Sequence, residues 1–124
     1  MHVHALDHVN IRTRDVEGTS RFYAELLGLE PKNVPNLMSA EQAYWLHDRA
    51  GRAIIHLRRF DCEPGPTGPI DHVAFSCSGK ARFLENLKAR GVDFRMQEIP
   101  SIGRTLVLLH DPNGVLLELN FAGD

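Results

Sequence analysis

The sequence lacks the features that would place it in a membrane, on nucleic acid or in an oxidising compartment. No hydrophobic run approaches the roughly 18 residues that a membrane-spanning helix needs, and the first residues do not read as a secretory signal. There is no basic run and the net charge is −2, which argues against a nucleic-acid partner. The two cysteines, Cys62 and Cys77, form no CxxC motif and no disulfide framework. We therefore expect a protein of the reducing cytoplasm.

Histidine, in contrast, is abundant, and two of the seven histidines lie in a repeated segment. The segment Leu6-Asp7-His8-Val9-Asn10-Ile11 returns 64 residues later as Ile70-Asp71-His72-Val73-Ala74-Phe75. At similar offsets, residues 46–51 resemble residues 109–114, and Ile55-His56-Leu57 resembles Leu117-Glu118-Leu119. Matches spread over the whole chain at nearly the same offset indicate a duplicated unit.

Each copy has the pattern of a strand, a helix and three further strands. Alternating apolar residues predict strands over 6–12, 29–39 (a short edge strand with a loop), 43–47, 53–60, 70–77, 94–99, 104–109 and 115–121. Apolar spacing, capping residues and following glycines predict helices near 15–27 and 79–90, the second capped at Ser78.

The fold class that follows is α+β. A segment with three prolines and two glycines, residues 61–69, reads as the linker between module one, residues 1–60, and module two, residues 70–124. Because about 60 residues make a marginal core alone, we expect one domain over 1–124. The two βαβββ modules should be related by a pseudo-twofold axis and form a curved sheet or barrel around a cleft.

Strand alternation places ligand-type residues on the faces away from the helices. His8, Asn10 and Arg12 should share one face of the first strand, opposite Val9 and Ile11. By the same rule, the polar faces of the other first and last strands carry His56 with Arg58, His72, and Glu118.

Three imidazoles and one carboxylate at repeat-equivalent positions predict a site for one divalent metal ion, Fe²⁺, Mn²⁺, Zn²⁺, Ni²⁺ or Co²⁺. The predicted ligands are His8, His56, His72 and Glu118. A subset of two histidines and one carboxylate is also the ligand pattern of non-haem Fe(II) oxygenases. His47 and His110 adjoin turns and are interpreted as structural.

The chain resembles the vicinal oxygen chelate superfamily, which includes glyoxalase I, extradiol dioxygenases, and fosfomycin- and bleomycin-resistance proteins. The resemblance rests on Asp7-His8-Val9, Phe22-Tyr23, Leu27-Gly28, the segment 71–75, and Asp111-Pro112-Asn113-Gly114 leading to Glu118. It implies paired βαβββ modules, a homodimer, and ligands on the first and fourth strands of each module. Those strands carry the same four residues chosen above.

The resemblance leaves three functions open. The first is a glyoxalase-like lyase or isomerase that acts on a small oxygen-chelating substrate through a metal-stabilised enolate. Glu118 would be its catalytic residue, and Arg12 and Arg58 would bind an anionic substrate. Arg12 matches the glyoxalase I pattern, whereas His56 stands where glyoxalase I usually has a carboxylate. The second is an Fe(II)-dependent extradiol-type dioxygenase with His8, His72 and Glu118 as the facial triad and His56 as the catalytic acid–base. The third is a resistance protein that binds an antibiotic or toxin.

Overall fold

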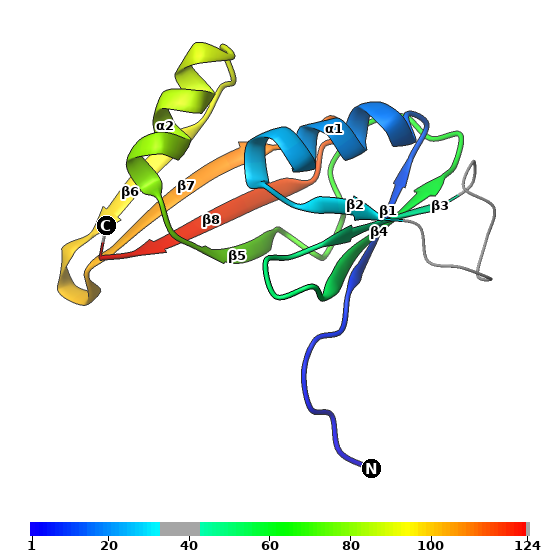
Figure 1. The fold of residues 1–124 in the computed structure, drawn as a ribbon, viewed down its shortest axis with the longest axis horizontal. Helices are drawn as coiled ribbons and strands as arrows, with labels where there is room; N and C mark the ends of the chain where they lie inside the picture. The colour runs from blue at the N-terminus through cyan, green and yellow to red at the C-terminus, as the bar shows by residue number, and fades with distance from the viewer. Residues whose placement is uncertain (33–42, 124) are drawn as a thin grey trace. The chain divides into compact units, whose positions relative to one another are not determined.

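The computed structural model describes residues 1–32 and 43–123, and the chain forms two compact units, Met1–Glu63 and Pro64–Asp124 (Figure 1). The boundary between them falls inside the predicted linker 61–69. Part of the predicted edge strand and loop at 29–39 lies outside the described residues. Within the described ranges, no helix has the length and apolar character needed to cross a membrane.

The first unit is a four-stranded mixed sheet with one helix. Its elements are β1 (Val9–Thr13), α1 (Val16–Leu27), β2 (Glu30–Lys32), β3 (Ala43–His47) and β4 (Ala53–Arg59). The strand order is β1-β4-β3-β2, in which β1 and β4 are parallel and the other pairs are antiparallel. Parallel neighbours need a crossover, and here the crossover contains α1 and the β2–β3 pair.

The core of this unit lies on the helix-covered face of the sheet. Ile11, Ile55 and Leu57 alternate with polar residues along β1 and β4, and all three are buried. Helix α1 contributes the fully buried Val16 and Tyr23. Burial of each such side chain contributes about 1.5–3 kcal/mol relative to exposure. The opposite face is therefore left to the polar members of the same strands, as the alternation predicts.

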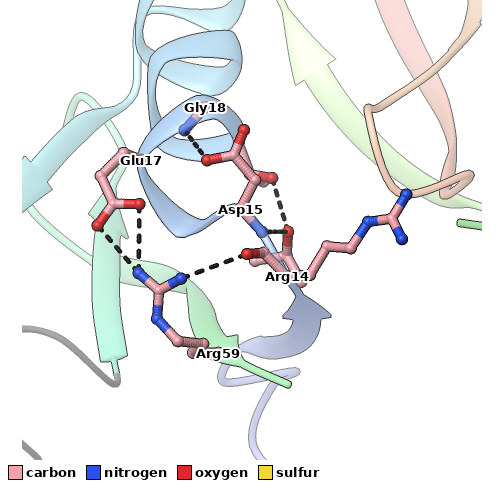
Figure 2. Close-up of polar contacts among 7 residues, drawn as sticks. Arg14, Asp15, Glu17, Gly18 and Arg59 are labelled. Atoms are coloured by element: carbon pink, nitrogen blue, oxygen red, sulfur yellow. Dashed lines mark hydrogen bonds and ion pairs between the residues drawn. The ribbon is translucent and has the colours of Figure 1, made fainter. Parts of the chain in front are cut away.

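Side chains fix both the start of α1 and its position on the sheet. The Asp15 carboxylate accepts a hydrogen bond from the Gly18 backbone N–H at 2.9 Å, as an N-cap does. Arg59, at the end of β4, donates to both Glu17 carboxylate oxygens at 3.0 and 3.2 Å and to the Arg14 carbonyl at 3.3 Å (Figure 2). The first turn of the helix is thus tied to the last residue of its neighbouring strand.

The second unit repeats this order of elements. Its elements are β5 (Val73–Cys77), α2 (Lys80–Ala89), β6 (Arg95–Ile99), a single 3₁₀ turn (Pro100–Ile102), β7 (Arg104–His110) and β8 (Leu116–Ala122). The strand order is β5-β8-β7-β6, again with the first and last strands parallel. Leu117, Leu119 and Phe121 are buried on one face of β8. The predicted tandem βαβββ arrangement and α+β class are confirmed; in the described residues the strands form two open sheets and no closed barrel.

The start of α2 differs from the prediction, whereas the predicted turn before β8 is present. Helix α2 begins after Gly79, which has a left-handed backbone (φ 82°), so Ser78 is not its N-cap. The turn before β8 needs its glycine: Gly114 has φ +88°, and a Cβ there would lie 2.5 Å from the Gly65 carbonyl oxygen. In this turn the buried Asp111 carboxylate accepts from the Asn113 and Val115 backbone N–H groups at 2.8 and 2.9 Å. Asp111 therefore has a structural role in this turn.

Candidate metal and substrate site

The four predicted ligands form two pairs, one in each unit. In the first unit, His8 lies just before β1, and its ring centroid is 6.3 Å from that of His56 on the neighbouring strand β4. In the second unit, His72 lies just before β5, and its Nε2 is 3.3 Å from Glu118 Oε2 on the neighbouring strand β8. Within the described residues, no cluster of three or more His, Cys, Asp and Glu side chains occurs.

The two pairs occupy equivalent positions in the repeat. Asn10 is the register partner of His56 in the parallel β1–β4 ladder, and Ala74 is the register partner of Glu118 in the β5–β8 ladder. Neighbouring parallel strands therefore bring each pair together for the same reason in both units. The predicted strand faces account for this, because His56 and Glu118 alternate with buried residues.

Each histidine that precedes a first strand is anchored by the aspartate before it. The Nδ1 of His8 lies 2.5 Å from Asp7 Oδ2, and the Nδ1 of His72 lies 2.8 Å from Asp71 Oδ2. A carboxylate that accepts from Nδ1–H leaves the Nε2 lone pair available, and metal-binding histidines usually have such a partner. The contact of each aspartate with its histidine was not predicted, and the recurrence of Asp-His in the sequence was the signal available for it.

His56 has a different environment, built by Trp45 and Asn10. The Trp45 ring stacks on the His56 ring, with centroids 4.3 Å apart and an interplanar angle of 1°, and its edge approaches His8 at 4.9 Å. The Asn10 amide Nδ2 lies 2.8 Å from His56 Nδ1. The His56 Nε2 atom is buried and has no hydrogen-bond partner among the described residues. Neither Trp45 nor the contact of Asn10 with His56 was predicted.

The two environments move the histidine pKa values in opposite directions. Burial lowers the pKa of His56, and electrostatic interactions with His8 and Arg58 lower it further. The hydrogen bond to Asp71 raises the pKa of His72, with a further contribution from the Glu118 charge. His56 is therefore the histidine that stays neutral to lower pH, and His72 is the one that retains its proton to higher pH.

The two arginines proposed for substrate binding lie on the polar side of the first sheet. Arg12 and Arg58 are register partners two residues beyond the Asn10–His56 pair, and both side chains are exposed. Arg12 lies over the Phe60 ring, 4.5 Å from its centroid. By strand alternation both arginines share the face of His56.

The donor set is chemically suited to a divalent ion. Imidazole nitrogens and a carboxylate are the usual ligands of Zn²⁺ and of related first-row ions. The 3.3 Å between His72 Nε2 and Glu118 Oε2 is a separation that two ligands of one ion can adopt. The Nε2 of His56, buried and without a partner among the described residues, is likewise a polar atom that a bound group could pair with.

Comparison with known proteins identifies the family of the chain. Residues 5–119 match the family model of the Glyoxalase/Bleomycin resistance protein/Dioxygenase superfamily. The chain is 28% identical to a protein named Glyoxylase I 4 of Arabidopsis thaliana, over 96% of this chain and 71% of that protein.

Solved structures share the fold at lower identity. A glyoxalase family protein of Bacillus anthracis superposes with a TM-score of 0.78 at 20% identity, covering 98% of each chain. A mutant of the fosfomycin resistance protein FosX from Listeria monocytogenes, in complex with Mn(II) and 1S,2S-dihydroxypropylphosphonic acid, gives 0.76 at 17% identity, covering 98% of this chain and 94% of that one. With the family model spanning most of its length and both modules in place, this chain belongs to the Glyoxalase/Bleomycin resistance protein/Dioxygenase superfamily.

Proposed function

We propose that this protein is a glyoxalase-like, divalent-metal-dependent lyase or isomerase that acts on a small oxygen-chelating substrate, such as an α-hydroxycarbonyl compound. One observation carries the proposal: each unit brings two ligand-type side chains together, and the His8 and His72 rings are anchored through Nδ1 by Asp7 and Asp71. Superfamily membership and the relative named Glyoxylase I 4 support it.

The proposed ligands are His8, His72 and Glu118, with His56 as a fourth ligand or within hydrogen-bonding distance of the bound substrate. One pair from each unit would contribute to one ion, either within one chain or between the two chains of a homodimer. When bound, Fe²⁺, Mn²⁺, Zn²⁺, Ni²⁺ or Co²⁺ supplies positive charge that stabilises an enolate oxygen. The FosX structure, which shares this fold and is in complex with Mn(II), supports the proposal of such an ion.

The side chains then divide the remaining work. As the one carboxylate in the proposed set, Glu118 would remove a proton from the carbon next to the substrate carbonyl and return it to the neighbouring carbon. His56, whose pKa is lowered mainly by burial, would be neutral and would hydrogen-bond a substrate oxygen. Arg12 and Arg58 would attract an anionic substrate to this face.

A second candidate is an Fe(II)-dependent extradiol-type dioxygenase. It is favoured by the contact of Asn10 with His56, because that contact sets His56 apart from the two aspartate-anchored histidines. His8, His72 and Glu118 would then be the facial ligands, with His56 transferring protons. Turnover of a catechol that requires oxygen would identify this activity, whereas isomerisation proceeds equally without oxygen.

Elemental analysis of protein purified without chelator or added metal tests the metal proposal. We expect one ion per chain in the wild type and none in His72→Ala or Glu118→Ala, because loss of one ligand removes much of the affinity. His110→Ala is the control, since His110 is exposed at the end of β7 and outside the site. Full metal content in either ligand variant would contradict the assignment, and a metal-free wild type would favour a binding protein.

The remaining expectations concern the partners. Members of the superfamily bind small molecules and are commonly dimeric. We infer a cytoplasmic homodimer for this chain, and light scattering of the purified protein measures its mass directly. A monomeric mass with full metal content would place both pairs of ligands on one chain.

A further inference from the structure

The contact between Asn10 and His56 determines which nitrogen of His56 carries the proton. The Asn10 Nδ2 atom is 2.8 Å from His56 Nδ1. An amide nitrogen can only donate a hydrogen bond, so Nδ1 must accept with its lone pair. A neutral imidazole has one N–H, and in His56 it must therefore be on Nε2.

The other ring nitrogen of His56, Nε2, has a proton to donate and needs an acceptor. The Nε2 of His56 is buried and has no partner among the described residues. A buried donor without an acceptor is unfavourable, and such a group calls for an explanation such as an absent ligand. The parallel stacking of Trp45 at 4.3 Å holds the ring in this orientation.

His8 and His72 are held in the opposite form. Their Nδ1 atoms face Asp7 and Asp71, and carboxylates at neutral pH can only accept. Both rings therefore carry a proton on Nδ1, which leaves Nε2 as the atom for a metal ion; in His72 that atom faces the Glu118 carboxylate at 3.3 Å, the proposed second ligand. Only the third histidine faces a donor.

The repeat shows that this arrangement is particular to His56. The equivalent of His56 in the second unit is Glu118, and the equivalent of Asn10 is Ala74. A carboxylate has no tautomers and needs no partner to select one. The amide therefore occurs where an imidazole replaces the carboxylate.

We propose that Asn10 is a positioning residue that holds neutral His56 as the Nε2–H tautomer, so that His56 donates a hydrogen bond to an anionic oxygen of the substrate instead of coordinating the ion. The proposal rests on the proposed function for the location of the substrate. A donor at His56 Nε2 favours substrates that carry a carboxylate or phenolate oxygen or that form an enolate. His8, His72 and Glu118 remain as the protein ligands of the ion.

The tautomer can be measured in metal-free protein. Long-range ¹H–¹⁵N correlation spectra of ¹⁵N-labelled protein at pH 8 should show His56 protonated at Nε2 in the wild type. In Asn10→Asp the new carboxylate can only accept, so the proton should move to Nδ1. Asn86→Asp is the matched control, because it makes the same charge change on α2, where residue 86 accepts a hydrogen bond from Arg90. A wild type protonated at Nδ1, or an Asn10→Asp variant that keeps the Nε2 proton, overturns the proposal.

Metal content gives a second, independent test. His56→Ala should keep one ion per chain, because three ligands remain, whereas His72→Ala should lose it. Loss of the ion from His56→Ala would overturn the donor assignment and make His56 a ligand. A wild type that binds no metal overturns the proposed function instead, and the tautomer spectra still decide the role of Asn10.

Discussion

Asp71→Ala removes the carboxylate that accepts a hydrogen bond from His72 Nδ1 at 2.8 Å. Without it, the ring can rotate and either nitrogen can carry the proton, so the ligand form of His72 is populated only part of the time. Outer partners of metal-binding histidines typically contribute about 10–100-fold to metal affinity. The Asp71 side chain is 83% exposed, so water can replace part of the bond. We therefore expect a loss of about tenfold, at the lower end of that range.

Competition with a chromophoric chelator for Zn²⁺ or Mn²⁺ measures the dissociation constant for wild type and variant. Asp93→Ala is the control, because Asp93 is an exposed aspartate of the same unit outside the site. The melting temperature should hardly change in either variant, since exposed substitutions have little effect on stability. If Asp71→Ala binds within twofold of wild type while His72→Ala fails to bind, the carboxylate does not orient the ligand and the reasoning is refuted.

Three further outcomes are expected. Because the hydrogen bond to Asp71 raises the pKa of His72 above its ordinary 6.5, metal affinity should fall as the pH drops through that raised pKa and protons compete with the ion. In Asp71→Ala the fall in metal affinity should begin at a lower pH, and chelator competition at a series of pH values measures both. His56→Glu changes the net charge of the metal-loaded site from near +1 to near zero, so calorimetric titration should show weaker binding of a catechol or small carboxylate while the metal is retained. Equal affinities of wild type and variant would mean that the charge of the site does not control recognition. Asp15→Ala removes the N-cap of α1 and should lower the free energy of unfolding by about 1 kcal/mol, which corresponds to a fall of about 4 °C in the melting temperature measured by circular dichroism. Ser78→Ala should leave the melting temperature unchanged, because Gly79 is the N-cap of α2. Equal melting temperatures of the two variants would contradict the capping role of Asp15.

The repeated sequence was sufficient to predict the order of the elements and the faces of most strands. Alternation placed Ile55 and Leu57 in the core and His56 on the opposite face, because the pleat of a strand imposes that period. The start of α2 was predicted less well, because Gly79 takes a left-handed conformation that no periodicity reveals.

The contacts around the histidines could not be predicted by the same rule. Alternation would place Asp7 and His8 on opposite faces, yet both precede β1, where no pleat constrains them, and their side chains meet. Counting back from the β3–β4 turn would pair Trp45 with Ile55. A register shift between Leu46 and His47 moves the pairing by one residue and places Trp45 beside His56.

The stacking of Trp45 on His56 also gives the protein an intrinsic optical probe. Trp45 is the one tryptophan of the sequence, so emission excited at the red edge of indole absorption comes from this position alone. Its ring is 4.3 Å from His56 and 4.9 Å from His8, within range of quenching by a paramagnetic ion or by a change in histidine charge. Candidate substrates can therefore be screened by titration of unlabelled protein, before any turnover assay exists, and a compound that changes the emission of wild type but not of His56→Ala is a compound that reaches the site.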